Sequence, residues 1–126
     1  MHVAGAYELE YLHVYSGTSA IPTATVRIRA HGEEREGASV GDGPVDAVCR
    51  AITAVTGASA RLVRYEIRAV TSGTEALGEA SVHLEDSGRK VTGRAASTDV
   101  VEASAKAFLD GLNQLARGAG RQASAS

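Results

Sequence analysis

Two short stretches of this 126-residue sequence carry the groups best suited to bind a small anion. Gly41-Asp42-Gly43-Pro44 directly precedes a segment with helical periodicity, and Ser97-Thr98-Asp99 precedes a second one. The first N–H groups of a helix have no partner within the helix and lie at the positive end of its dipole, so they favour an anion such as a carboxylate. Simple N-capping, which almost every helix needs, is the competing interpretation of both stretches.

The residue types that most often perform catalysis form no recognisable set in this sequence. The histidines are His2, His13, His31 and His83. No two of them have the short spacing with which one strand or helix holds a metal ion, so the sequence predicts no metal site. The single cysteine, Cys49, lies in the middle of a helical pattern, which favours core packing over a nucleophile. No catalytic residue is therefore predicted in this chain.

Composition excludes several classes of partner. The formal net charge is -2 with both signs interspersed, and only 4% of residues are aromatic. These values argue against a nucleic-acid surface and against a polybasic membrane patch. No apolar run approaches the ~20 residues that span a bilayer. One cysteine cannot form an intrachain disulfide, and a buried thiol is typical of a reducing compartment, so we expect a cytoplasmic protein.

The elements that must position these residues occur twice, because the sequence resembles itself when it is shifted by 56 positions. The shift aligns Ser16-Gly17-Thr18 with Ser72-Gly73-Thr74 without a gap. Further identical pairs follow in order: Ala24/Ala80, Val26/Val82, Gly32/Gly88, Gly37/Gly93, Val45/Val101 and Ala47/Ala103. Such an ordered series indicates an internal duplication.

Each copy has the pattern of three strands followed by a helix. Alternation and turn residues predict strands at 7–15, 23–30 and 33–40, and again at 62–71, 79–85 and 89–96. His31-Gly32 and Asp86-Ser87-Gly88 are the expected hairpin turns. Apolar residues at helical spacing predict one helix from Pro44 to a stop at Gly57 and a second that begins near Ser97 and continues to Leu115.

These elements predict a single α+β domain over residues 1–116, with internal pseudo-two-fold symmetry. It consists of two tandem βββα units, at about 7–57 and 61–116, with antiparallel sheets and the helices packed on one face of them. Residues 117–126 have no period, so we expect a disordered tail. One helix per unit cannot cover every apolar strand position, so we expect a homodimer.

Several motifs resemble the C-terminal regulatory domain of 2-isopropylmalate synthase, a domain that citramalate synthase shares. The similarity runs from about Tyr7 to Leu115. In chain order the motifs are Ser16-Gly17-Thr18, Ile21-Pro22-Thr23-Ala24-Thr25-Val26, Gly41-Asp42-Gly43-Pro44-Val45-Asp46-Ala47, Thr71-Ser72-Gly73-Thr74-Glu75-Ala76-Leu77-Gly78 and Gly93-Arg94-Ala95-Ala96-Ser97-Thr98-Asp99-Val100-Val101.

The resemblance implies an allosteric domain of two βββα units that dimerises and binds an end-product amino acid. That effector is leucine in isopropylmalate synthases, for feedback inhibition of leucine biosynthesis, and isoleucine in many citramalate synthases. The family's catalytic TIM barrel binds a metal ion and condenses acetyl-CoA with a 2-oxo acid, and nothing in this sequence corresponds to it. The chain is thus expected to need no cofactor of its own, and it is either an excised fragment or an independent gene product.

A leucine zwitterion needs donors for its carboxylate, acceptors for its ammonium group and an apolar pocket. The resemblance places the ligand between the helix starts and the first strand of the second unit. The candidate ligand-binding residues are Gly41, Asp42, Gly43, Asp46, Leu62, Tyr65, Ala69, Ala76 and Val100. A module that only dimerises and binds no ligand is the alternative.

Overall fold

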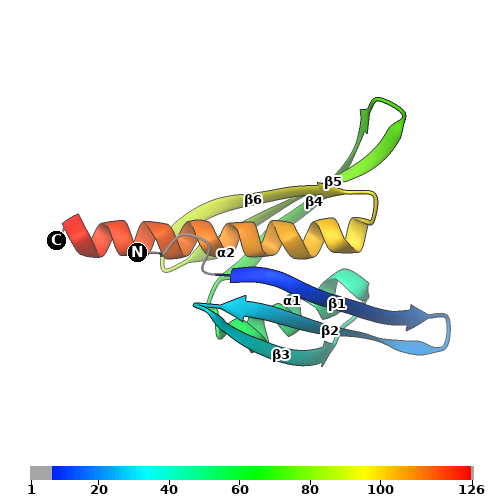
Figure 1. Cartoon of the computed structure of the whole chain (residues 1–126), viewed down its shortest axis with the longest axis horizontal. Helices are drawn as coiled ribbons and strands as arrows, with labels where there is room; N and C mark the ends of the chain where they lie inside the picture. Colours follow the sequence, from blue (N-terminus) through cyan, green and yellow to red (C-terminus); the bar gives the residue numbers. More distant parts are fainter. Residues whose placement is uncertain (1–6, 126) are drawn as a thin grey trace.

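The chain folds into two βββα units, as the duplication predicts. The computed structural model describes residues 7–125, and it describes their side chains except at 71–72 and 118–125. The elements are β1 (Tyr7–Gly17), β2 (Ala20–Ala30), β3 (Glu33–Val40), α1 (Pro44–Thr56), β4 (Arg61–Ser72), β5 (Glu75–Asp86), β6 (Arg89–Ser97) and α2 (Val100–Ala125). Two antiparallel sheets result, with the orders β1-β2-β3 and β4-β5-β6 (Figure 1).

Local sequence explains where most of these elements begin and end. His31 and Gly32 have φ angles of 53° and 84°, and Ser87 and Gly88 have 54° and 83°. Positive φ at both central residues is the mark of the tight hairpin turn whose twist matches the flanking strands. Helix α1 ends at Gly57, which has a φ of 70° and donates its N–H to Thr53 O at 2.8 Å. Both predicted hairpins and the predicted helix stop are confirmed.

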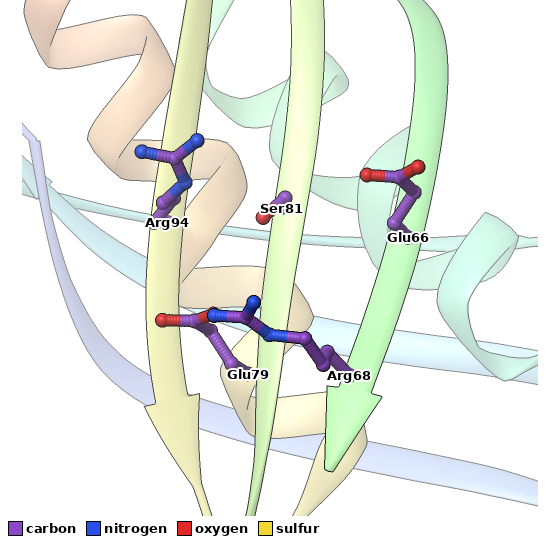
Figure 2. Close-up of a pocket in the computed structure, with 5 residues that line it drawn as sticks. All are labelled: Glu66, Arg68, Glu79, Ser81 and Arg94. Carbon is purple, nitrogen blue, oxygen red and sulfur yellow. The ribbon is translucent and has the colours of Figure 1, made fainter. Parts of the chain in front are cut away.

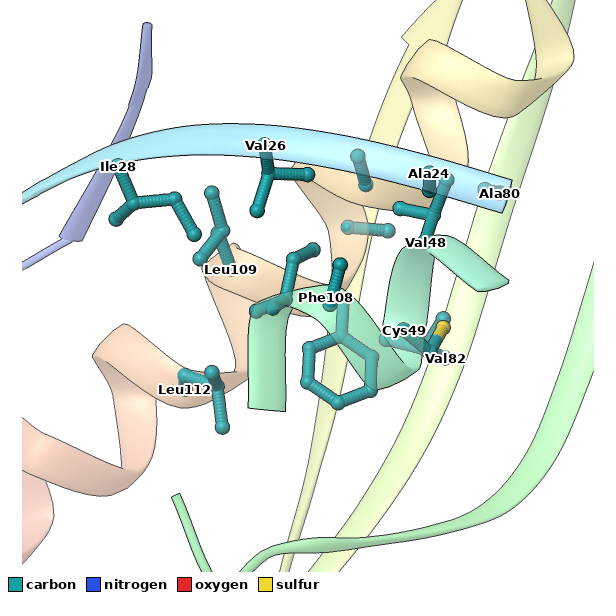
Figure 3. Close-up of a cluster of buried hydrophobic side chains, with 14 of the residues drawn as sticks. Ala24, Val26, Ile28, Val48, Cys49, Ala80, Val82, Phe108, Leu109 and Leu112 are labelled. Carbon is teal, nitrogen blue, oxygen red and sulfur yellow. The ribbon is translucent and has the colours of Figure 1, made fainter. Parts of the chain in front are cut away.

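One core joins the two units. Alternate residues of the central strands β2 and β5 are fully buried, namely Ala24, Val26, Ile28, Ala80, Val82 and Leu84. They meet Val48 and Ile52 of α1 and Phe108 and Leu112 of α2 (Figure 3). Apolar side chains, nearly all of them aliphatic, therefore fill the space between the sheets and the helices, and burial of this surface is the main force that holds the units together.

Helix α2 is the element that connects the two sheets. It packs on β5 and β6 of its own unit and also against β1 and α1 of the first unit (Figure 1). Asn113 accepts a hydrogen bond from Tyr7 N at 2.9 Å and donates one to Tyr7 O at 3.0 Å. One amide side chain thus satisfies both backbone groups of a residue 106 positions away in the chain.

The end of α2 differs from the sequence expectation. The helix continues to Ala125, whereas composition predicts a disordered tail from Arg117. Alanine, arginine and glutamine are favourable helix formers, and a helix that is already nucleated adds residues at low cost. The expected domain limits of 1–116 include residues 1–6, which lie outside the described residues. Those limits stay a prediction.

Among residues 7–125, no helix is both long and apolar enough to cross a membrane.

Candidate functional site

The backbone at the start of α1 has the open geometry that an anion site requires. Gly43 is the N-cap, with an extended backbone, and no side chain caps it. Pro44 occupies the first turn, where its missing N–H has no consequence. Donors at this helix start are the backbone N–H groups of Gly43, Val45 and Asp46, which have no carbonyl one turn earlier to bind.

The two glycines of this turn have different roles. A Cβ on Gly41 would lie 2.4 Å from Ala47 N and 2.8 Å from Asp46 Oδ2, so only glycine allows the turn to pass this close to α1. Gly41 N also donates to Pro22 O at 3.0 Å, which anchors the turn to β2. A Cβ on Gly43 would meet no atom within 4 Å. Gly41 is therefore a structural residue, whereas Gly43 borders open space.

Asp46 has fixed partners in the structure. Its Oδ2 atom accepts hydrogen bonds from Asp42 N and from Arg50 Nε, both at 2.9 Å. Arg50 neutralises the charge that Asp46 would otherwise place beside the helix start. Since Asp46 already holds the turn together, the exposed carboxylate of Asp42 is the better placed acceptor for an ammonium group.

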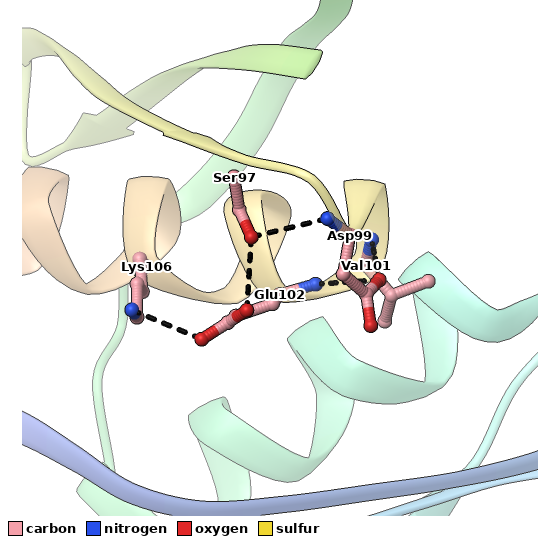
Figure 4. Close-up of polar contacts among 5 residues, drawn as sticks. All are labelled: Ser97, Asp99, Val101, Glu102 and Lys106. Carbon is pink, nitrogen blue, oxygen red and sulfur yellow. Dashed lines mark hydrogen bonds and ion pairs between the residues drawn. The ribbon is translucent and has the colours of Figure 1, made fainter. Parts of the chain in front are cut away.

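The start of α2 is closed by its own side chains. Asp99 Oδ1 accepts hydrogen bonds from Val101 N at 2.9 Å and Glu102 N at 3.3 Å. Ser97 joins Glu102 at 2.9 Å, and Lys106 lies 3.0 Å from the same carboxylate (Figure 4). Lys106 and then Ser97 hold the pKa of Glu102 below its ordinary value. A ligand carboxylate here would have to displace Asp99, so α1 offers the more accessible helix start.

Both helices begin at the same end of the molecule (Figures 1 and 4). The β4–β5 hairpin turns at this end too (Figure 1). Val100, the first residue of α2, lies over Gly78 of β5, where a Cβ would meet Val100 Cγ2 at 3.0 Å. Gly78 is paired with Ala69 of β4, and Ala76 lies two residues before it on the same face. The structure thus gathers Ala69, Ala76 and Val100 near the start of α2.

The other second-unit candidates lie farther along β4. Leu62 and Ala69 are seven residues apart on one strand, which corresponds to about 20 Å, so one leucine side chain cannot contact both. Tyr65 lies between them, and its hydroxyl group is 2.7 Å from Ser104 Oγ of α2. Among the described elements, α1 and β4 share no extensive contact. The predicted residues therefore divide into three sets. One is the turn at 41–46 before α1, the second is Ala69, Ala76 and Val100 near the start of α2, and the third is Tyr65 and Leu62 farther along β4.

The comparison with protein families decides the assignment. Residues 2–116 match the model of the LeuA allosteric (dimerisation) domain, which is most of the chain. The chain belongs to that family. The resemblance to the C-terminal regulatory domain of 2-isopropylmalate synthase is confirmed by this match and by the relatives described next.

The relatives of this allosteric (dimerisation) domain are considerably longer proteins. It is 54% identical over 110 residues to the 2-isopropylmalate synthase of Heliobacterium modesticaldum, covering 87% of this chain and 22% of that protein. It is 52% identical over 114 residues to the 2-isopropylmalate synthase of Carboxydothermus hydrogenoformans, covering 90% and 22%. The chain spans about a fifth of the length of these relatives.

Ile67 of the allosteric (dimerisation) domain is an exposed apolar residue close to Tyr65 and Ala69 that is not among the predicted site residues. Ile67 lies opposite Ala80, on the same face of the sheet as Tyr65 and Ala69, and it is 40% exposed. Alternation of Tyr65, Ile67 and Ala69 along one strand was the available signal, since alternate residues share a face. The face is open at β4 because α2 packs on β5 and β6.

Cys49 is a core residue of the domain. Only 6% of it is exposed, and it packs in the cluster shown in Figure 3. Burial raises the pKa of its thiol from the ordinary 9.0 to about 12, and the Asp46 carboxylate adds to the shift. Within the part of the chain that the structure describes, no three His, Cys, Asp or Glu residues are placed to hold a metal ion.

We expect the Cys49 thiol to resist modification in the folded domain. At pH 8, a disulfide reagent should label Cys49 at least ~100-fold more slowly than in 8 M urea, because a buried thiol is neither ionised nor accessible. Labelling of the folded chain should also fail to accelerate when the pH passes 9, where an ordinary thiol ionises. Fast native labelling with an upturn near pH 9 would contradict the buried position.

Proposed function

We propose that this chain is the domain through which leucine regulates a 2-isopropylmalate synthase, acting as a homodimer in the cytoplasm and joined to a catalytic domain. The family match over residues 2–116 is the observation that carries the proposal. The uncapped start of α1 supports it locally, because it is the feature of the described chain that suits an amino-acid carboxylate.

In this proposal the leucine carboxylate accepts hydrogen bonds from the N–H groups of Gly43, Val45 and Asp46. The ammonium group binds the Asp42 carboxylate, since Asp46 is already held by Arg50. The isobutyl group packs toward Val100, Ala69 and Ala76 at the same end of the molecule. Small side chains at positions 69 and 76 leave room for a branched ligand, which larger residues would fill.

Regulation requires more than binding. Leucine can inhibit the full enzyme only if it binds one arrangement of the regulatory dimer more tightly than another, because only a difference in affinity shifts a conformational equilibrium. The coupling of such systems is typically about 1–3 kcal/mol. The isolated chain can therefore bind leucine, while inhibition is a property of the longer enzyme.

Isoleucine is the alternative effector, as in many citramalate synthases. The names of the relatives favour leucine, because those described above are 2-isopropylmalate synthases. A domain that only dimerises is the other alternative, and it predicts no binding of any branched-chain amino acid.

Calorimetric titration of the chain with leucine, isoleucine and valine tests the proposal. Leucine should bind more tightly than valine by about 1 kcal/mol, or roughly fivefold, because it buries one more methylene group. Isoleucine should bind less tightly than leucine. If isoleucine binds most tightly, the domain is of the isoleucine-sensing type found in citramalate synthases. If none of the three amino acids gives a heat of binding, dimerisation is its function.

A further inference from the structure

The two sheets have four edge strands, and α2 occupies two of them. It lies along β1 from Tyr7 to Leu12, and Asn113 binds both backbone groups of Tyr7. On β6, Arg94 N donates to Asp110 Oδ2 at 3.0 Å, and Thr92 O accepts from Gln114 Nε2 at 2.8 Å. These bonds engage Tyr7 at the start of β1 and two backbone groups in the middle of β6. Among the described residues no side chain bonds the backbone of β3 or β4, so we take these two strands as the open edges.

The two open edges differ in their charges. Strand β3 begins with Glu33-Glu34-Arg35-Glu36. A two-fold antiparallel pair of β3 strands centred on Glu34, Arg35 or Glu36 would set glutamates opposite glutamates, and like charges in that position are destabilising. Residues 37–40, the second half of β3, include no charged residue that could complement a partner strand. Strand β3 is therefore poorly suited to pair with its own copy.

Strand β4 differs from β3 because it has a register in which opposite charges face each other and none of its glutamates faces a glutamate. Arg64, Glu66 and Arg68 alternate on the outer face of the sheet (Figure 2 shows Glu66 and Arg68). In an antiparallel pair centred on Ile67, Glu66 lies opposite Arg68 of the partner subunit, and the same contact recurs across the two-fold axis. The irregularity of β4 falls between Leu62 and Arg64, outside the paired segment.

The uncovered side of β4 adds apolar surface to the same contact. Ile67 is 40% exposed, and it would lie opposite the partner's Ile67 at the centre of the pair. Tyr65 would lie opposite the partner's Ala69. Long, unpaired strand edges with exposed apolar residues are rarely left open in natural proteins, because they pair with whatever strand they meet.

We propose that β4 is the edge through which a second copy of this chain joins, so that the dimer contains one continuous sheet with the order β6-β5-β4-β4-β5-β6. This inference rests on the proposed dimeric function and specifies its interface. The new hydrogen bonds lie in the plane of the sheet. The start of α1 stays accessible to an amino acid, because α1 and β4 share no extensive contact. The partner's Tyr65 then lies beside Ala69, which we propose to contact the isobutyl group.

Charge exchange on β4 tests the interface, with the dissociation constant of the dimer measured by sedimentation velocity. Glu66→Arg sets two arginines against each other across the axis, and Arg68→Glu sets two glutamates against each other. Each should weaken the dimer about tenfold, since an attractive cross-strand pair becomes repulsive at two symmetric positions. The double exchange restores opposite charges and should bring the dissociation constant back to within about threefold of the unaltered chain. Glu36→Arg on the other open edge, β3, is the matched control and should change nothing.

Cross-linking tests the register directly. Ile67→Cys should form a covalent dimer under mild oxidation, because residues directly opposite in an antiparallel pair have Cβ atoms close enough for a disulfide. The Arg35→Cys variant on β3 should form no covalent dimer under the same conditions, as judged by non-reducing gel electrophoresis of both variants. Cys49 stays in both variants because it is buried.

The outcomes separate this inference from the proposed function. A chain that sediments as a monomer up to ~100 µM would contradict dimerisation itself. If the chain dimerises but the β4 charge variants leave the dissociation constant unchanged and Ile67→Cys forms no cross-link, the β4 interface alone is overturned. A dimer weakened by Glu36→Arg would place β3 in the interface and would overturn the inference as well.

Discussion

The Gly93→Ala variant is expected to lose about 3 kcal/mol or more of its unfolding free energy, and it should be at best partly folded at 37 °C. A Cβ on Gly93 would lie 2.0 Å from Ala107 O and 2.5 Å from Gly111 N, so β6 and α2 meet backbone to backbone. Backbone atoms cannot rotate away, and the helix would have to shift on the sheet. Urea denaturation followed by circular dichroism measures the loss.

The internal duplication supplies the control for this variant. Gly37 is the equivalent of Gly93 in the first unit, and its Cβ would meet Val55 Cγ2 at 2.7 Å. Because Val55 is a side chain that can move, Gly37→Ala should cost only about 1 kcal/mol. Equal stabilities of Gly37→Ala and Gly93→Ala would show that β6 and α2 do not approach as closely as the structure indicates.

The Gly43→Val variant is expected to lose leucine binding while it keeps its fold. Nothing lies within 4 Å of a Cβ at this position, and the extended backbone, with a φ of −156°, is one that valine adopts readily. The isopropyl group would cover the N–H groups at the start of α1, where we propose the leucine carboxylate binds. Calorimetry should show an affinity for leucine that is lower by more than ~30-fold. The ligand would lose its charge-assisted hydrogen bonds to the N–H groups as well as access to the site.

Two further variants show whether the loss belongs to this turn. Gly17→Val makes the same change at another glycine with open surroundings, and it should leave leucine binding intact. Tyr65→Ala removes the hydrogen bond to Ser104 and should weaken both stability and binding. If Gly43→Val is folded by circular dichroism and binds leucine as the unaltered chain does, the start of α1 is not the carboxylate site.

Much of the fold could be predicted because its signals are local. Alternation along residues 23–30 predicted the buried face of β2, and His31-Gly32 predicted the turn that follows. Pro44 and Gly57 marked the two ends of α1. Each of these signals depends on residues a few positions apart, whose periodicity and allowed backbone angles act before any distant contact forms.

The candidate site could be predicted only in part. The turn at 41–44 and the start of α2 are recognisable in the sequence as helix starts. The sequence does not show which of the two is capped by a side chain. Asp99 caps α2, while Asp46 turns back to Asp42 N and leaves Gly43 uncapped. Both arrangements use the same residue types, and only the orientation of each carboxylate distinguishes them.

Contacts between distant segments depend on the tertiary structure alone. Asn113 binds the backbone of Tyr7, and α2 covers β5, β6 and β1 but leaves β4 open. The bonded partners lie on different units, so no spacing in the chain could reveal them. The same packing decides that Ile67 is exposed although its alternation matches that of a core residue. Periodicity determines which face of a strand is apolar, whereas the position of a helix in space determines how much of that face is covered.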